Sequence, residues 1–365
     1  MLKFLKKLLL ASLVLGLLLA GAGFYLYQTW LLPRLEAPFA TATLPLRFEV
    51  ESGHSASRIL DQLEQLGLLR DARVARYYLI WVLKDAPLRA GEYEVTRPLA
   101  PRELLDKLIR GEVYVRPLKL IEGLTAFEMV DEMVKQGFGD REAFLREIAR
   151  VSRIVDLDPL APNLEGYLYP DTYLFASKTT EEKVIDVLVA GFRKHFDNEV
   201  KPLLDTPGAT TLSVRQLVTL ASIVEKETQA EEERQLVASV YANRLRRDIG
   251  LYADPTIIYA KKLAGTWDGN LRKADLKLES PYNTYLVPGL PPGPICSPSV
   301  RSLLAAAQPA DTNYLYFVSR NDGTHVFSET LAEHNRNVDL WQRQYWRRKW
   351  AEERSSLDRG TGERR

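Results

Sequence analysis

The stretch that decides the fold is residues 217–228, with the sequence LVTLASIVEKET. Its apolar residues cover most sides of a helix, which predicts a helix at the centre of a domain, running from Ser213 to about Gln229. Two acids, Glu225 and Glu227, stand at its end. A carboxylate in apolar surroundings is costly to bury unless it has a partner or a chemical role. We therefore expect one of these acids to carry out the chemistry of the protein.

The two acids cannot face the same site. Each helical residue turns the chain by about 100°, so residues two apart point about 200° apart. Glu225 falls within the main apolar stripe, so periodicity favours it as the more buried acid. The other interpretation, for either acid, is a structural salt bridge near the helix end, with Lys226 or Arg234 as partner.

The N-terminal segment predicts a membrane anchor at residues 1–33. Three lysines, at positions 3, 6 and 7, precede a run without charge from Leu8 to Pro33. A helix of about 20 apolar residues crosses a bilayer, whereas the apolar part of a cleaved signal peptide has about 7–15. Aromatic residues suited to the far membrane interface follow: Phe24, Tyr25, Tyr27 and Trp30. The lysines predict a cytoplasmic N-terminus. The alternative is a signal peptide cleaved near Ala20-Gly21-Ala22.

Composition excludes several classes of function. The 365 residues carry a formal net charge of +1, which does not suggest nucleic-acid binding. The single cysteine, Cys296, cannot form an internal disulfide, and is either a buried small hydrophobe or a reactive thiol. The four histidines lie far apart in the sequence, so we expect neither a metal site nor a cofactor.

The remaining chain predicts an α+β protein in several parts. We expect a linker at residues 34–45, a small subdomain at 46–122, a larger mixed α/β catalytic domain at 123–345, and a charged, disordered tail at 346–365. The subdomain has strand, helix, helix and strand in that order, which resembles a LysM-like glycan-binding module. A spacer that sets the distance from the bilayer is the alternative.

Two loops display aromatic and polar side chains suited to a sugar. Residues 163–173, NLEGYLYPDTY, offer Glu165, Tyr169 and Asp171, although tyrosines packed inward would explain the same pattern. Residues 280–299 contain six prolines, which exclude helix and central strand and predict a long, stiffened loop. This loop adds Tyr282, Asn283 and Tyr285.

Before the second loop, Asp254-Pro255 is typical of a helix N-cap followed by proline at the first helical position. That capping role alone would account for Asp254.

Five segments in order resemble the endolytic murein transglycosylases of the YceG-like (MltG) family: ASIVEKET (221–228), RQLVASVYANRL (234–245), DPTIIYA (254–260), SPYNTY (280–285) and GLPPGPI (289–295). The resemblance implies a membrane-anchored lytic transglycosylase, a lyase, with a LysM-like subdomain. Such an enzyme cleaves the β-1,4 bond from N-acetylmuramic acid (MurNAc) to N-acetylglucosamine (GlcNAc) within nascent peptidoglycan and leaves 1,6-anhydro ends. Lytic transglycosylases place their acid just before Ser or Thr at a helix end. This pattern selects Glu227, followed by Thr228, with Glu225 as the fallback.

The expected mechanism uses one glutamate as acid and then base, without a cofactor or metal. The expected location is the inner membrane, with the catalytic domain in the periplasm, peptidoglycan strands as substrate and peptidoglycan synthases as further partners. One alternative is a non-catalytic peptidoglycan-binding scaffold. Another is a hydrolytic glycosidase, which would need a second acid facing Glu227 across the cleft, about 5–10 Å away.

Overall fold

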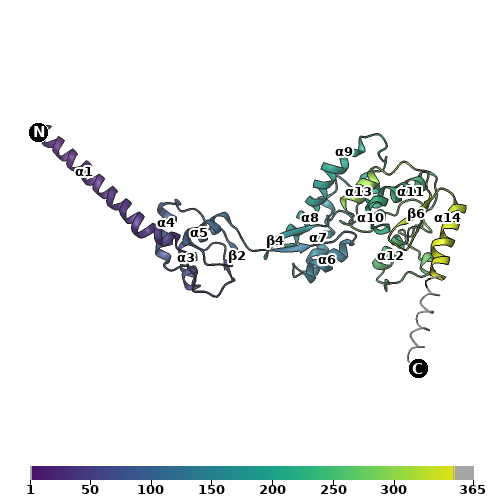
Figure 1. Ribbon diagram of the computed structural model, residues 1–365, viewed down its shortest axis with the longest axis horizontal. Coiled ribbons are helices and arrows are strands. Elements are labelled where there is room, and N and C mark those ends of the chain that lie inside the picture. The colour runs from purple at the N-terminus through teal and green to yellow at the C-terminus, as the bar shows by residue number, and fades with distance from the viewer. Residues whose placement is uncertain (1, 348, 350–365) are drawn as a thin grey trace, which may run out of the picture. The chain divides into compact units, whose positions relative to one another are not determined.

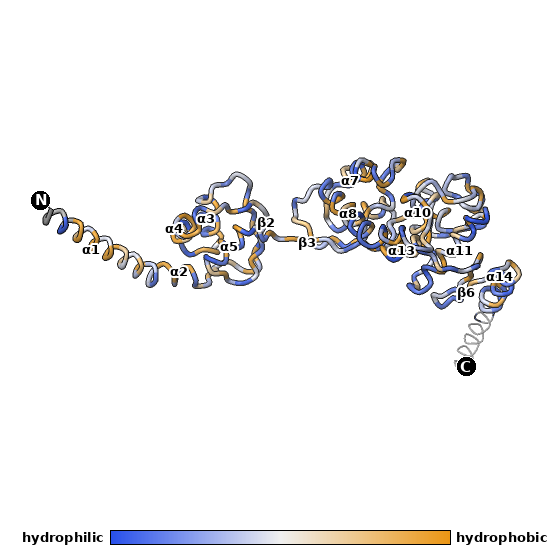
Figure 2. The backbone as a smooth tube through the Cα atoms, turned by 90° about the horizontal axis from the view of Figure 1, so that it is seen from above, coloured by the Kyte–Doolittle hydropathy of each residue, from blue (hydrophilic) through white to orange (hydrophobic). Residues whose placement is uncertain are grey.

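The computed structural model describes residues 2–347 and 349 and has a mixed α+β fold (Figure 1). Near its N-terminus lies α1 (Leu2–Leu26), which continues through a π-helical segment (Tyr27–Leu31) into α2 (Leu32–Glu36). Residues from Leu9 to Glu36 form a helix long and apolar enough to cross a membrane. Figure 2 shows the hydrophobic residues along it.

The first of two compact units contains the chain up to Arg116 together with Leu174–Lys178. Its strands β1 (Leu46–Val50) and β2 (Gly91–Val95) pair antiparallel, with Phe48 opposite Tyr93. Three helices complete the unit: α3 (Ala56–Gln65), α4 (Ala72–Trp81) and α5 (Pro101–Arg110). The expected linker at residues 34–45 begins inside α2, where Leu35 is fully buried in the core of this unit. Leu35, near the end of the apolar helix, thus joins that helix to the folded unit.

The second unit contains Pro117–Tyr173 and the chain from Thr179 onward. Strands β3 (Val115–Lys119) and β4 (Thr172–Ala176) form a two-stranded sheet, and β5 (Tyr316–Ser319) and β6 (His325–Ser328) form another. The α-helices of this unit are α6 (Ala126–Lys135), α7 (Arg141–Ile148), α8 (Glu181–His195), α9 (Lys201–Leu204), α10 (Val214–Glu227), α11 (Arg234–Arg246), α12 (Asp254–Leu263), α13 (Val300–Ala307) and α14 (Leu331–Val338). A π-helical segment, Asp339–Gln344, follows α14. Of the tail predicted at 346–365, position 348 and everything beyond 349 lie outside the described residues.

Helix α10 is fixed at its start by a reciprocal cap and then buried on all sides. The Ser213 hydroxyl accepts from the backbone N–H of Gln216, and the Gln216 side chain accepts from the N–H of Ser213. Every residue from Leu217 to Val224 is buried, and α11, α12 and α13 pack around the helix. Because the burial is continuous, the last turn of α10 has a fixed position, and so do the two glutamates on it.

The proline-rich loop is ordered by its own polar contacts. No helix or strand occurs between Leu278 and Ser299, as the prolines predict. The amide nitrogen of Asn283 donates to the carbonyls of Leu276 and Leu278 at 3.1 and 2.8 Å. Near the end of the loop, Pro294 packs against Gly166 so closely that a Cβ there would lie 2.5 Å from the proline ring. The two loops predicted to display aromatic side chains are therefore packed against each other.

Candidate functional site

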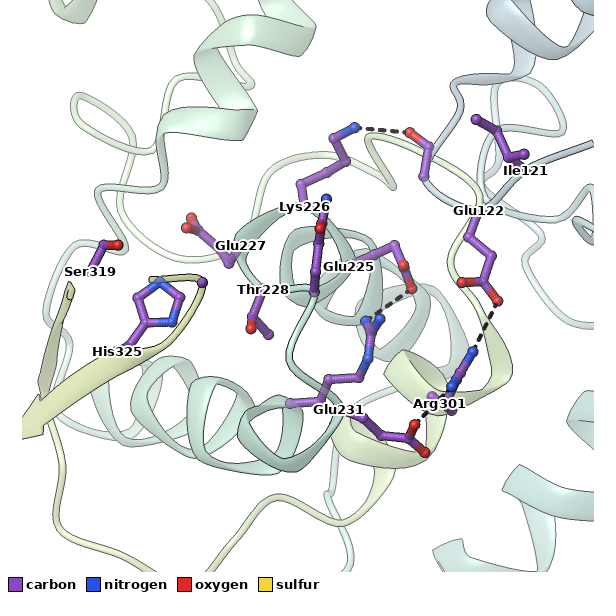
Figure 3. Close-up of a pocket in the computed structure, with 14 residues that line it drawn as sticks. Ile121, Glu122, Glu225, Lys226, Glu227, Thr228, Glu231, Arg301, Ser319 and His325 are labelled. Atoms are coloured by element: carbon purple, nitrogen blue, oxygen red, sulfur yellow. Dashed lines mark hydrogen bonds and ion pairs between the residues drawn. The ribbon is translucent and has the colours of Figure 1, made fainter. Parts of the chain in front are cut away.

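A pocket of about 680 Å³ opens at the C-terminal end of α10 (Figure 3). Its wall includes the five residues from Glu225 to Gln229, together with Arg301 and the residues Ser319 and His325 from the β5–β6 hairpin. Both candidate acids thus lie at one pocket, and their hydrogen-bond partners separate their roles.

Glu227 is half-buried and carries a raised pKa. The Tyr241 hydroxyl from α11 donates to Glu227 Oε1 at 2.7 Å. Burial raises the pKa of Glu227 to about 7; the hydrogen bond from Tyr241 lowers it, and the negative charge of Asp254 raises it further. The Glu227 carboxyl can therefore exist in both its protonated and its ionised form near neutral pH.

Asp254, whose negative charge affects the pKa of Glu227, contacts the first of two neighbouring tyrosines. The Tyr285 hydroxyl donates to Asp254 Oδ1 at 2.8 Å, and the Tyr252 ring lies 5.3 Å from the Tyr285 ring. Burial, Asp254 and Glu227 together raise the pKa of Tyr285, so this phenol stays protonated and remains a donor. The expected capping role of Asp254 is wrong. Ala253 occupies the N-cap position of α12, no side chain caps it, and Asp254 is the first helical residue.

Glu225 has a complete set of partners. Its Oε2 lies 3.3 Å from the guanidinium of Arg234 and accepts from both the backbone N–H and the hydroxyl of Ser299, at 2.9 and 2.6 Å. The side chain is 6% exposed. This is the salt-bridge interpretation left open for the two acids, and it applies to Glu225. The Glu225 carboxylate is thus occupied by a cation and two hydrogen-bond donors.

A second polar pair stands at the pocket wall. His325 Nδ1 lies 2.7 Å from Glu233 Oε2, and the backbone N–H of His325 donates to the other oxygen at 2.9 Å. Both side chains are nearly buried, with 12% and 10% exposure. With Nδ1 engaged by the carboxylate, the Nε2 side of the ring is left for other contacts. The wide separation of the histidines in the sequence gave no signal for this pair.

The three residues predicted on the first loop do not line the pocket. Glu165 is 4% exposed, and accepts from the backbone N–H of Ala126 at 2.9 Å and from the Tyr259 hydroxyl at 3.2 Å. Burial raises the pKa of Glu165 to about 8. Tyr169 stacks on His195 with ring centres 4.1 Å apart, and Asp171 accepts from the N–H of Thr172 at 2.6 Å. These contacts stabilise the loop and the start of α6.

The three residues predicted on the proline-rich loop have different surroundings, and one of them lies near Glu227. Tyr285 lies beside Asp254, close enough for the Glu227 charge to affect its pKa. Tyr282 packs against Tyr259 at 4.8 Å between ring centres, near Glu165. Asn283 is fully buried and holds the loop together.

Sequence reasoning missed Tyr241, although it lies within RQLVASVYANRL, because Val237, Val240, Tyr241 and Leu245 have the spacing of an apolar stripe on a helix. Cys296 is fully buried, with a pKa raised well above its usual value by burial. Its thiol is thus protonated and inaccessible, in agreement with the reading as a small hydrophobe.

Comparisons with known proteins identify the family of this chain. The model of the YceG-like family matches residues 48–340. The endolytic murein transglycosylase of Bacillus subtilis (strain 168) is 32% identical over 331 residues, which cover 86% of this chain and 89% of that protein. The endolytic murein transglycosylase of Streptococcus pneumoniae serotype 2 is 30% identical over 366 residues, covering 91% of this chain and 65% of that protein. The crystal structure of a yceG-like protein from Listeria monocytogenes gives a TM-score of 0.54 at 30% identity, covering 81% of this chain and 99% of that one.

Proposed function

Because the chain belongs to the YceG-like family, we propose that it is an endolytic murein transglycosylase, which cleaves peptidoglycan glycan strands without water. The bond cleaved is the β-1,4 link from MurNAc to GlcNAc, and the product carries a 1,6-anhydro-MurNAc end. The observation that carries the proposal is the pair of glutamates on the last turn of α10. Glu225 is neutralised by Arg234, whereas Glu227 lines the pocket with a pKa of about 7.

Glu227 is the general acid of the first step. Because the pKa of Glu227 is about 7, the protonated form is substantially populated near neutral pH. The protonated carboxyl donates that proton to the glycosidic oxygen as the bond to C1 breaks, and the GlcNAc-bearing strand leaves as an alcohol. The N-acetyl group of the substrate stabilises the oxocarbenium-like centre at C1.

The same carboxylate is the base of the second step. Ionised Glu227 takes the proton of the C6 hydroxyl, and the C6 oxygen bonds to C1 and closes the anhydro ring. The proton lost in the first step is regained in the second, so the enzyme returns to its starting state. The substrate supplies its own nucleophile, and therefore no second carboxylate is required to activate water.

The neighbours of Glu227 keep its two forms close in energy. Tyr241 donates to the carboxylate and favours the ionised form, whereas Asp254 repels that charge and favours the protonated form. Tyr285 and Tyr252 offer aromatic faces beside the acid for a sugar ring. We retain Tyr285 as a substrate-binding residue and assign Glu165, Tyr169 and Asn283 stabilising roles because of their contacts.

Asp254 also supports a second candidate function, hydrolysis. Its carboxylate lies close enough to raise the pKa of Glu227, as the second acid of a glycosidase would. Digestion in H₂¹⁸O separates the two functions. A transglycosylase releases 1,6-anhydro ends without ¹⁸O, and a hydrolase releases reducing ends that carry it.

The N-terminal helix supports a proposal for the placement of the protein in the cell. Residues 9–36 are apolar enough to span a membrane, and the lysines at positions 3, 6 and 7 favour a cytoplasmic N-terminus. We propose that the protein is anchored once in the inner membrane, with the second unit in the periplasm near peptidoglycan synthases. The order β1, α3, α4, β2 supports a LysM-like role for the first unit.

The test is Glu227→Gln in the full chain, assayed on purified glycan strands for anhydro-ended products. Glu231→Gln is the matched control, because Glu231 lines the same pocket but pairs with Arg301 at 2.8 Å. We expect the first variant to lose activity by a factor of about 10² or more and the control to retain it. Wild-type rates for Glu227→Gln would refute the assignment. Strand binding without any cleavage by the wild-type protein would favour the scaffold.

A further inference from the structure

We propose that the outer surface of α4 and of its C-cap residue, formed by Tyr77, Ile80, Trp81 and Val82 and called here the α4 face, rests on the same lipid bilayer that the N-terminal helix crosses. The inference goes beyond the proposed catalytic function and depends only on the proposed anchor. The occupant is the interfacial zone of the membrane, where lipid headgroups meet acyl chains.

The α4 face is apolar where a water-facing helix surface is usually charged. Its four side chains are 57%, 45%, 78% and 43% exposed, in sequence order. The opposite side of α4 is buried in the core of the first unit through Val74, Ala75, Tyr78 and Leu79. The inner apolar side of the helix is explained by its burial in the core. The outer apolar side is exposed, and the packing of the unit does not explain it.

The path of the chain brings α4 to the membrane. Trp30 is 45% exposed at the expected interface, Leu31 already packs against the core of the first unit, and Leu35 is fully buried in it. At a rise of about 1.5 Å per residue, only about 8 Å of helix separates Trp30 from Leu35. Helix α2, which holds Leu35, contacts α4 directly.

The folded unit therefore begins at the membrane surface, and α4 lies within about one helix diameter, roughly 10 Å, of the segment that leaves the bilayer. Figures 1 and 2 both show α4 beside the end of the N-terminal helix, with β2 at the other side of the same unit.

The side chains of the α4 face are better suited to the interfacial zone of a bilayer than to charged lipid headgroups alone. Tryptophan and tyrosine are enriched where a bilayer meets water, because one part of each ring is apolar and another can form hydrogen bonds. The two arginines within α4 are already paired, Arg73 with Asp71 at 3.0 Å and Arg76 with Asp61 at 3.1 Å. We therefore expect contact with zwitterionic and with anionic lipid alike.

The experiment uses the full chain reconstituted in phosphatidylcholine nanodiscs, with a single nitroxide label on an introduced cysteine. Cys296 is fully buried and its thiol is protonated, so it does not compete for the label. Trp81→Cys reports on the α4 face. Ser52→Cys, in an exposed turn after β1, is the matched control on the same unit, and Leu18→Cys reports whether the anchor is inserted.

We expect the label at position 81 to collide more often with oxygen than with a water-soluble nickel complex, as at position 18, and the label at position 52 to show the reverse. Labels at 81 and 52 that are equally open to the nickel complex, with the label at 18 protected, would overturn the inference and leave the anchor intact. Exposure at all three positions would instead refute the anchor. Immobilisation of the label at 81 by purified peptidoglycan, and not by the bilayer, would identify the face as a glycan-binding surface and overturn the inference as well.

Discussion

Replacing Tyr241 by phenylalanine isolates the hydrogen bond that sets the acidity of Glu227. The hydroxyl donates to the carboxyl at 2.7 Å and favours its ionised form. A hydrogen bond to a charged group contributes about 1.5–3 kcal/mol, and one pKa unit corresponds to about 1.36 kcal/mol. Loss of the bond should therefore raise the pKa of Glu227 by about one to two units, from about 7 in the wild type.

The assay is the initial rate of anhydro-muropeptide release from purified glycan strands between pH 5 and pH 10. The first step requires protonated Glu227, so the rate falls above its pKa. In Tyr241→Phe we expect this alkaline limb to move to higher pH by about one to two units. The plateau at low pH should fall, because a weaker acid transfers its proton less readily.

A control for folding accompanies the measurement. The ring at position 241 meets Phe317 edge to face at 6.0 Å between centres, and phenylalanine preserves that contact. The variant should therefore melt close to the wild type. An alkaline limb that stays in place or moves to lower pH, in a variant that is folded, would refute the assignment of Glu227 as the titrating acid.

Three other changes have outcomes of known sign. Asp254→Asn removes the negative charge that raises the pKa of Glu227, so the alkaline limb of the same rate profile should move to lower pH; a shift upward would contradict this. Glu165 has a pKa of about 8 in the folded protein against about 4.5 when unfolded, so the folded state binds more protons between these values and stability falls as pH rises through them. In Glu165→Gln, the free energy of unfolding measured in urea should no longer fall between pH 5 and pH 8 for this reason. An unchanged fall would contradict the raised pKa of Glu165. Glu225→Ala leaves Arg234 buried without its partner and should lower the free energy of unfolding by about 3–5 kcal/mol, whereas a loss below about 1 kcal/mol would show the pair to be dispensable.

Local signals in the sequence predicted the elements that local contacts determine. The sequence has Thr125 and Glu128 in the spacing of a capping box, and α6 begins directly after Thr125, at Ala126. The prolines of residues 280–299 predicted a loop without helix or strand, which the structure has. In each case the deciding residues are neighbours in the chain, so their effect does not depend on the rest of the fold.

The partners of the two acids depend on contacts between distant segments. Ser299, which binds Glu225, lies 74 residues further along the chain, and Tyr241, which binds Glu227, belongs to the next helix. Periodicity gives the direction in which a side chain points but not the group that it meets there. For the same reason, the amide of Asn283 suggested a sugar ligand, whereas in the structure that amide donates to a carbonyl of its own loop.

The last turn of α10 explains how one helix end holds one glutamate in an ion pair and leaves a transferable proton on another. The C-terminus of a helix carries a partial negative charge, which disfavours any carboxylate placed there. Glu225 overcomes this with the cation of Arg234 and two donors from Ser299. Glu227 faces the other way, and its donor among the described residues is the neutral Tyr241 hydroxyl, which is too weak to offset burial, so the pKa is raised to about 7. Thr228 then ends the helix in an extended conformation, so that the chain turns away and leaves the carboxyl at the pocket instead of covering it with another helical turn.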